Sequence, residues 1–128
     1  MTSNINGSIS IMKDLRLKKA LELFNSGNWY QAHDLLEELW HESNPVERVT
    51  LQGFLQIAVA QLHLEKGNYS GATILYGEGL GRLKREGIPD LGIDLKVLCV
   101  TLGNRLRLLQ NNEKLLDTPP PMLFKIDK

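Results

Sequence analysis

The sequence predicts an all-α fold, a compact bundle of about five helices that ends in an extended, proline-containing tail. Apolar residues recur at three- and four-residue steps in five segments. Breaks that contain glycine or proline separate these segments. One of the breaks occurs twice, which predicts two helical hairpins of the same kind.

The first hairpin is expected in the N-terminal third of the chain. Apolar residues recur helically from Asp14 to Phe24, and the break at 25–28 contains a glycine suited to ending a helix. A second helix is expected from Trp29 to about His41, with its apolar residues on one face. Pro45 cannot continue a helix interior and therefore separates this helix from the next one.

The second hairpin is expected to contain the buried centre of the bundle. Its first helix runs from near Val46 to about Lys66 and carries no charge between Val49 and Leu64, which is typical of a helix surrounded by others. Its second helix runs from Tyr69 to about Arg85. Three glycines at 77, 79 and 81 cost about 1 kcal/mol each there, which indicates a close approach by another helix.

A last helix and an extended tail complete the expected fold. The helix opens at Asp90 or Asp94 and carries leucines in register up to Leu109. The prolines at 119–121 then predict a polyproline segment, followed by apolar residues that dock back on the bundle. We therefore expect a disordered tail over 1–12, a helical bundle domain over 13–112 and an extended tail over 113–128.

The break that occurs twice has the pattern G-x-[aromatic]-x-x-A, at residues 27–32 and again at 67–72. It resembles the centre of a tetratricopeptide repeat, in which the glycine turns the chain and the alanine lets the helices approach. The two copies lie about 40 residues apart, against about 34 in that repeat, and only two are present. The prediction is therefore a compact bundle of tetratricopeptide-like hairpins and not an open superhelix.

Composition narrows the function classes. Fifteen basic and fifteen acidic residues cancel, so nothing steers the chain to nucleic acid or to an anionic membrane. No apolar run approaches the roughly 18 residues of a membrane span, and residues 1–10 lack the pattern of a secretory signal. The single cysteine, Cys99, excludes an internal disulfide and lies on an apolar helix face. We expect a cytoplasmic, soluble protein with Cys99 in its core.

Polar residues within apolar helix faces are the candidate site. His33 and Glu37 are one helical turn apart, while Gln52, Gln56 and His63 form a polar line on the next helix. Buried polar groups need partners, so we expect the two stripes to meet as an internal cluster of His33, Glu37, Gln56 and His63.

Three interpretations of this cluster stay open. The first is a hydrogen-bond network that only fixes helix register. The second is a divalent metal site with His33, Glu37 and His63 as ligands, although the spacing matches no H-E-x-x-H motif. The third is an acid–base site in which Glu37 activates His33. No cofactor is otherwise predicted, and Trp29 and Trp40 are candidate aromatic anchors of the core.

Two longer motifs resemble a known family. F-N-x-G-x-W-Y-x-A-H-D-x-L-E-x-x-W and L-Q-G-F-L-Q-I-A-V-A-Q-L-H-x-x-x-G-N-x-x-G-A, followed by G-I-D, are similar to the family of domain of unknown function 309. The likeness extends over about Leu15 to Leu109 and implies a helical, tetratricopeptide-like bundle without an established activity. Its characteristic residues fall here on His33, Glu37, Trp40, Gln52, Gly53, Gln56, His63, Asn68, Gly71 and Ala72.

Three functions follow as hypotheses, with the balance against an enzyme. The repeated joint and the lack of a complete catalytic motif favour a protein-interaction module that binds a protein or peptide partner. The alternative is a small enzyme or metal-binding protein that uses His33, Glu37 and His63 in an internal pocket. A third hypothesis is a homo-oligomer that pairs through the face of Gly77 to Gly81 or through the last helix.

Overall fold

The computed structural model describes residues 11–126, which are all-α as predicted. A helical turn at 11–13 precedes the five longer helices of this part of the chain. These are α2 (Leu15–Asn25), α3 (Trp29–Glu42), α4 (Pro45–Glu65), α5 (Tyr69–Leu83) and α6 (Leu95–Gln110). The expected disorder of residues 1–10 lies outside the described residues. Ile11, expected in that tail, is buried in the core, so the folded part begins before residue 13.

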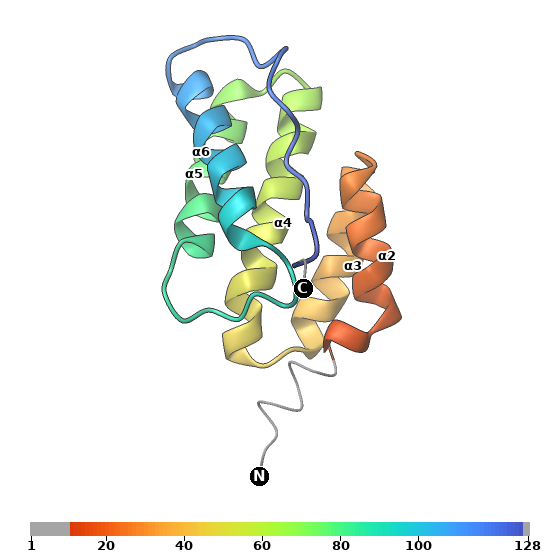
Figure 1. The fold of residues 1–128 in the computed structure, drawn as a ribbon. Coiled ribbons are helices and arrows are strands. Elements are labelled where there is room, and N and C mark those ends of the chain that lie inside the picture. Colours follow the sequence, from red (N-terminus) through yellow and green to blue (C-terminus); the bar gives the residue numbers. More distant parts are fainter. Residues whose placement is uncertain (1–10, 127–128) are drawn as a thin grey trace.

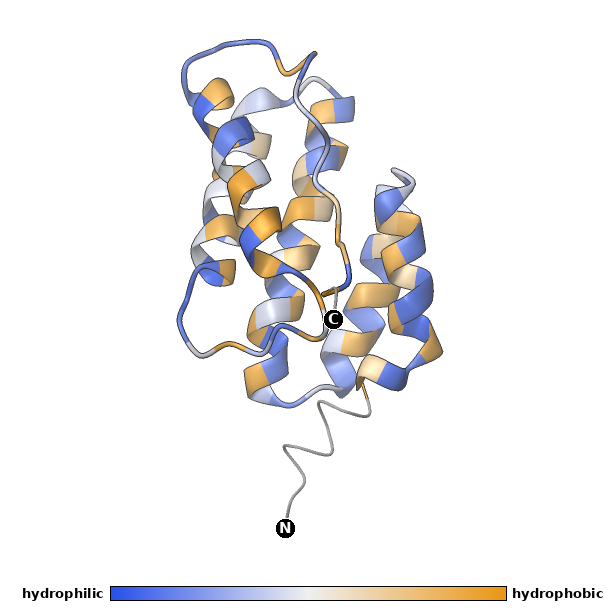
Figure 2. Cartoon of the chain, viewed as in Figure 1, coloured by the Kyte–Doolittle hydropathy of each residue, from blue (hydrophilic) through white to orange (hydrophobic). Residues whose placement is uncertain are grey.

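Each helix packs against the next one in the chain and runs antiparallel to it (Figure 1). Short turns join α2 to α5 in order, and a longer loop over 84–94 leads to α6. Helix α4 lies in the middle, with α3 on one side and α5 on the other. Its central position explains why its sequence is apolar on most sides, and Figure 2 shows hydrophobic residues along its length. No helix within residues 11–126 has the length and hydropathy that crossing a bilayer requires.

Side-chain caps begin the helices close to the predicted positions. Asp14 accepts a hydrogen bond from the backbone of Arg16 at 2.8 Å and opens α2, and Asp94 likewise opens α6. At α4, Asn44 and Glu47 form a reciprocal capping box around Pro45. The proline that separates α3 from α4 is thus the first residue of α4, a position where its missing N–H costs nothing.

The two copies of the repeated break have the same geometry. In the first, Asn28 N–H donates to Leu23 O at 2.8 Å and Gly27 N–H donates to Phe24 O at 3.1 Å. In the second, 40 residues later, Asn68 N–H donates to His63 O at 2.8 Å and Gly67 N–H donates to Leu64 O at 3.0 Å. Both are Schellman motifs with a left-handed glycine, φ +83° and +76°. The closer likeness to tetratricopeptide repeats stays a prediction.

Replacing the glycine at either joint tests this geometry. A Cβ on Gly27 or Gly67 meets no atom within 4 Å, so the cost of alanine arises from the left-handed backbone alone. We expect Gly67→Ala to lower the free energy of unfolding by about 1 kcal/mol, measured by urea denaturation. Gly81→Ala, at an exposed helical position with open space around it, is the control and should raise stability by up to about 1 kcal/mol. Equal effects at both positions would contradict the assignment.

The two candidate aromatic anchors differ in their burial. Trp29 is buried and meets Phe24 edge-to-face, with ring centroids 4.9 Å apart, which joins the two sides of the first hairpin. Trp40 is half-buried, and the guanidinium of Arg48 lies 4.4 Å from its ring centroid. Arg48 also donates to the last carbonyls of α3, at Trp40 and His41, and so holds α3 against the start of α4.

The tail returns across the bundle as an extended strap between α2 and α4 (Figure 1). The predicted docking of the tail on the bundle is confirmed for Leu123, which is 1% exposed. Phe124 and Ile126 are exposed. Asn25 binds the backbone of Leu123 twice, since Leu123 N–H donates to Oδ1 at 2.7 Å and Nδ2 donates to Leu123 O at 3.0 Å. A short antiparallel bridge between Ile93 and Lys125 then fixes the end of the strap.

Candidate functional site

The polar residues expected to form one internal cluster do not meet. Glu37 is exposed, and half-buried His33 lies beside its neighbour Asp34, with Nδ1 and Oδ1 3.5 Å apart. Gln56 donates to Glu78 at 2.9 Å and accepts from Arg82 at 2.9 Å, both on α5. The prediction of an internal cluster is therefore wrong, because Gln56 turns toward α5 and not toward α3.

The other members of the predicted set are also apart. His63 forms a hydrogen bond with Asn68 in the second joint, at 3.0 Å. Gln52 is half-buried and makes no side-chain hydrogen bond within residues 11–126. In that same part of the chain no three histidine, cysteine or carboxylate side chains gather as metal ligands would. The candidate ligands His33, Glu37 and His63 are thus not brought together.

A different polar network fills the centre of the second hairpin. Its members are Gln61 on α4, Tyr76 on α5 and Arg105 on α6. The Tyr76 hydroxyl donates to Gln61 Oε1 and accepts from Arg105 Nε at 2.8 Å. Arg105 Nη2 also donates to Gln61 Oε1, at 3.4 Å. Three helices are therefore joined by one buried cluster, which we call the Arg105 network.

The tail completes this network. Arg105 Nη1 donates to the hydroxyl of Thr118 at 3.2 Å and to the carbonyl of Pro119 at 3.1 Å. Thr118 in turn donates to Leu115 O at 2.6 Å. The guanidinium thus holds the start of the strap in place, and the strap covers one side of the guanidinium.

The positive charge of Arg105 has no counterion among the described residues. Its side chain is buried, with 6% of the residue exposed, and every acceptor that it contacts is neutral. By contrast, Arg16 on the surface pairs with Asp14 at 2.9 Å and with Glu42 at 2.7 Å. Burying an unpaired guanidinium costs several kcal/mol, and arginine cannot lose its proton to avoid that cost.

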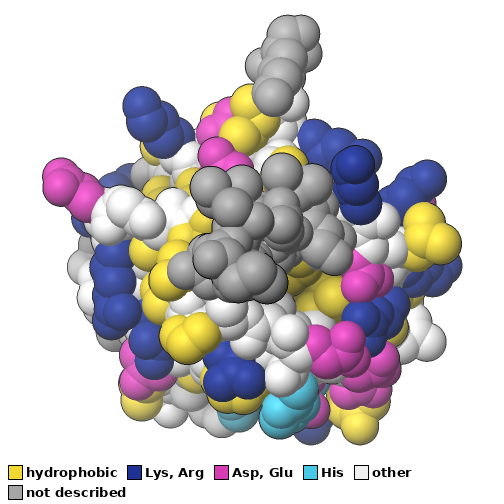
Figure 3. Space-filling model, turned by 90° about the horizontal axis from the view of Figure 1, so that it is seen from below, with side chains coloured by type: hydrophobic (Ala, Val, Ile, Leu, Met, Phe, Trp, Pro, Cys, Tyr) yellow, Lys and Arg dark blue, Asp and Glu magenta, His cyan; other side chains and the backbone are white. Residues whose placement is uncertain are grey.

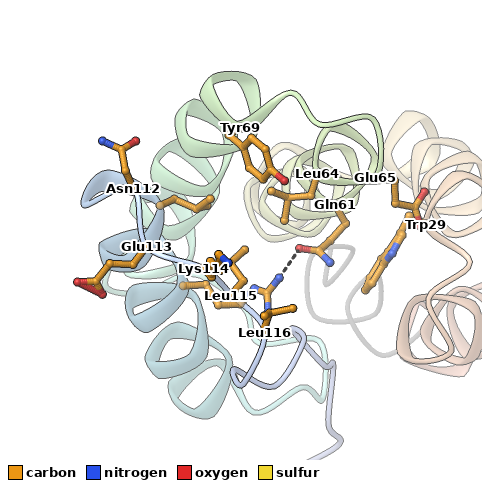
Figure 4. A pocket seen from close by; sticks show the side chains of 12 residues that line it. Trp29, Gln61, Leu64, Glu65, Tyr69, Asn112, Glu113, Lys114, Leu115 and Leu116 are labelled. Carbon is orange, nitrogen blue, oxygen red and sulfur yellow. Dashed lines mark hydrogen bonds between the residues drawn. The ribbon is translucent and has the colours of Figure 1, made fainter.

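Arg105 lies at a cleft of about 760 Å³ between the second hairpin, α6 and the loop that follows α6 (Figure 4). Figure 4 shows Gln61 and Leu64 between Tyr69 and Trp29, with Leu115 and Leu116 on the facing side. Most of the wall is apolar. The lining residues are Trp29, Gln61, Leu64, Glu65, Tyr69, Arg105, Leu109, Asn112, Glu113, Lys114, Leu115 and Leu116.

Donors of the network remain available to this cleft. A guanidinium has five N–H groups, and those of Arg105 make four hydrogen bonds within residues 11–126. Gln61 accepts two hydrogen bonds through Oε1, which leaves both N–H groups of Nε2 without an acceptor in the described part of the chain. Because Arg105 can only donate, it dictates that Oε1 and not Nε2 faces it. Nε2 is not among the fully buried unpaired atoms, so it retains accessible surface.

Burial raises the pKa of the Tyr76 hydroxyl, and the nearby charge of Arg105 opposes the shift only in part. Tyr30 and Tyr69 are exposed. We expect the Tyr76 hydroxyl to ionise above about pH 10 in an ultraviolet titration, and this step to be absent in Tyr76→Phe. Since the folded pKa exceeds the unfolded one, the stability contributed by neutral Tyr76 is complete below about pH 10 and is lost as the pH rises through the folded value. An ionisation below about pH 10 that disappears in Tyr76→Phe would contradict this assignment.

Cys99, the remaining nucleophile candidate, is half-buried against the core as expected. Burial raises the pKa of its thiol, with Lys84 opposing, so the thiolate that would act as a nucleophile is disfavoured at neutral pH. The residue does not line the Arg105 cleft.

With this geometry in hand, the chain can be compared with known proteins. Residues 17–75 match the family described as domain of unknown function 309. The resemblance stated from the motifs is thereby confirmed over α2, α3, α4 and the first half of α5. The matched segment ends before Tyr76, so of the Arg105 network it includes only Gln61.

One curated relative extends the comparison beyond the segment that matches the family model. The chain is 31% identical over 101 residues to uncharacterized protein YpuF of Bacillus subtilis. The aligned region covers 77% of this chain and 54% of YpuF, so the chain spans about half the length of that relative. Neither comparison carries an activity, and the function is therefore argued from the site itself.

The network was missed at the sequence level although a signal for it exists. Leu98, Leu102, Arg105 and Leu109 follow one another at steps of four, three and four, so Arg105 occupies a core position of α6. A charged residue is almost never fully buried unless it is paired, so an arginine in this register indicates a buried polar network. The predicted site was built from histidines, glutamines and a carboxylate, and so it did not include this arginine.

Proposed function

We propose that this protein is a non-enzymatic interaction module that binds a peptide segment of a partner in the Arg105 cleft. One observation carries the proposal: a cleft of about 760 Å³ with mostly apolar walls is lined by a buried guanidinium that has one unused N–H and no counterion among the described residues. Clefts of about 300–1,000 Å³ with apolar walls and a few placed polar groups are the usual form of ligand sites.

The way in which the bundle holds its own tail favours a peptide as the ligand. Asn25 binds both backbone groups of Leu123, and Arg105 binds the carbonyl of Pro119. These contacts are to main-chain atoms of an extended segment, so the bundle already holds one extended segment by its backbone. The Arg105 cleft adjoins this strap through Leu115 and Leu116, so a second segment can enter beside the first.

The lining residues favour binding over catalysis. Among the described residues the cleft is lined by no histidine, cysteine or serine, and so it offers no nucleophile–base pair. The raised pKa of Tyr76 keeps its hydroxyl protonated at neutral pH and unsuited to act as a base. No observation favours the metal or acid–base alternative at His33, Glu37 and His63.

A random peptide library displayed against the full chain tests this proposal. The selected peptides are then measured on Tyr69→Ala/Leu116→Ala, which removes two exposed side chains from the cleft. Tyr30→Ala/Val100→Ala is the matched control, because both residues are similarly exposed and lie outside the cleft. We expect about a tenfold loss of affinity for the first variant and none for the control. A library that yields no enriched peptide, or peptides equally affected by both variants, would contradict the proposal.

A further inference from the structure

We propose that the Arg105 cleft recognises the free C-terminal carboxylate of a peptide whose last side chain is apolar. This inference rests on the proposed function and names the chemistry of the ligand. It starts from the donors at the cleft, the charge of its rim and the apolar walls beside them.

Two side chains at the cleft have unused N–H donors, and each can bind one oxygen of a carboxylate. Arg105 Nη2 and the Gln61 amide are adjacent, because Nη2 donates to Gln61 Oε1 at 3.4 Å. The fifth guanidinium N–H and the Nε2 group of Gln61 make no hydrogen bond within residues 11–126 and belong to side chains that line the same cleft. A carboxylate held by an arginine and an amide gains strong, charge-assisted hydrogen bonds and supplies the missing counterion.

The rest of the described chain does not supply that counterion. Glu65 and Glu113 line the cleft but are exposed, and no ion pair within the described residues includes Arg105. Figure 4 shows the carboxylate of Glu113 pointing away from Gln61 and from the hydrogen bond that Gln61 accepts. The guanidinium therefore keeps an unused charge that a ligand can neutralise.

The charge of the rim disfavours a highly charged ligand. Lys114 adds one positive charge to that of Arg105, while Glu65 and Glu113 add two negative charges. The four charges cancel, so a polyphosphate or a nucleic acid gains no net attraction there. Figure 3 shows the molecule from below, the end away from this cleft, and there too basic and acidic side chains are interspersed among the described residues.

The apolar walls select a chain end over an acidic side chain. Trp29, Leu64 and Leu109 line the same cleft as the polar pair, so a ligand with an apolar group close to its carboxylate fits both. A C-terminal leucine or phenylalanine carries both groups on the same carbon. Aspartate and glutamate carry their carboxylate at the tip of the side chain, away from any apolar group. A small carboxylic acid shares the chemistry but lacks the main-chain groups that the strap contacts suggest for the site.

The test compares three probes on the full chain. These are acetyl-Gly-Gly-Leu with a free carboxylate, the same peptide as its C-terminal amide, and 4-methylpentanoate as the small acid. Binding is followed by isothermal titration and by the fluorescence of Trp29 in a Trp40→Phe background, since Trp29 lines the cleft and Trp40 does not. We expect the free acid to bind at least about tenfold more tightly than the amide, and more tightly than the small acid.

A variant that keeps the network supplies the second arm. Gln61→Glu retains the oxygen that Tyr76 and Arg105 contact, but it removes the amide donor and neutralises the guanidinium from within. We expect this variant to lose at least about tenfold in affinity for the free acid. Gln31→Glu adds the same charge at an exposed site outside the cleft and should bind as the wild type does.

The outcomes separate the inference from the proposed function. Equal binding of acid and amide, unchanged binding by Gln61→Glu, or no binding of the acid would overturn the carboxylate assignment. The small acid binding as tightly as the peptide would overturn the assignment to a chain end. If the binding of library peptides depends on Tyr69 and Leu116 but not on a free carboxylate, the proposed interaction module stands and only the carboxylate assignment is wrong. The comparison of acid with amide needs no variant, so it stands even where a substitution prevents folding.

Discussion

Gly79→Leu is expected to destabilise the protein by about 3 kcal/mol, since overpacking a tight contact typically costs about 1–3 kcal/mol and a side chain of this size lies at the upper end. A Cβ at Gly79 already lies 2.8 Å from Ile57 Cδ1 and 3.3 Å from the carbonyl oxygen of Gly53. Helices α4 and α5 touch there through their backbones, so a leucine must push the two helices of the second hairpin apart. Because Tyr76 and Gln61 join the same two helices, the substitution should also loosen the Arg105 network. Urea denaturation measures the loss.

Gly77→Leu is the control for this prediction. Gly77 lies two residues earlier on α5 and is exposed, and a Cβ at this position would meet no atom within 4 Å. The same substitution there should raise stability by up to about 1 kcal/mol through helix propensity. Similar losses at both positions would show that the close approach of α4 and α5 is not what Gly79 serves. The exposure of Gly77 and Gly81 also leaves self-association through this face as a prediction for light scattering.

Leu123→Ala is the second large effect that we expect, a loss of about 3 kcal/mol. Leu123 is the buried side chain of the strap, and its backbone is bound by Asn25 at 2.7 and 3.0 Å. The strap can undock while the helices stay folded. The loss of stability therefore cannot exceed the free energy with which the strap binds to the bundle. Hydrogen exchange should therefore show lower protection at Leu123 and Ile126, whose amides are bonded to Asn25 and Gly92.

The neighbouring residue provides the matched comparison for the strap. Phe124 is larger than Leu123 but 49% exposed, so Phe124→Ala should cost well under half as much. A greater loss at Phe124 than at Leu123 would contradict the docking of the strap. Undocking also removes the acceptors Thr118 and Pro119 from Arg105, which links the strap to the charge at the cleft.

Local chemistry explains why so much of the fold was predictable. Asp14, Asn44 and Asp94 are caps whose effect depends on three or four neighbouring residues, and the glycines at 27 and 67 end helices through their own backbone freedom. The end of α5 was predicted at about Arg85 and lies at Leu83, four residues before the left-handed Gly87. Signals of this kind are contained in the sequence itself.

The candidate site was predicted wrongly because it depends on how helices face one another. The wheel places Gln56 correctly on α4 but says nothing of whether α3 or α5 lies on that side, and α5 does. The Arg105 network draws on α4, α5, α6 and the tail, whose relative rotations no local pattern specifies. Of this network, only the position of Arg105 among the core leucines of α6 can be recognised from the sequence.

The most direct test of carboxylate binding by Arg105 is a heteronuclear NMR titration that follows the side-chain N–H resonance of this residue. The resonance is assigned by its loss in Arg105→Lys. Addition of acetyl-Gly-Gly-Leu as the free acid should shift the Arg105 Nε–H signal, while the surface arginine Arg16, already paired with Asp14 and Glu42, serves as the internal reference. The amide of the same peptide should leave both signals in place. An Arg105 signal that does not move with the acid, or that moves equally with the amide, would contradict the assignment of this charge to a carboxylate ligand.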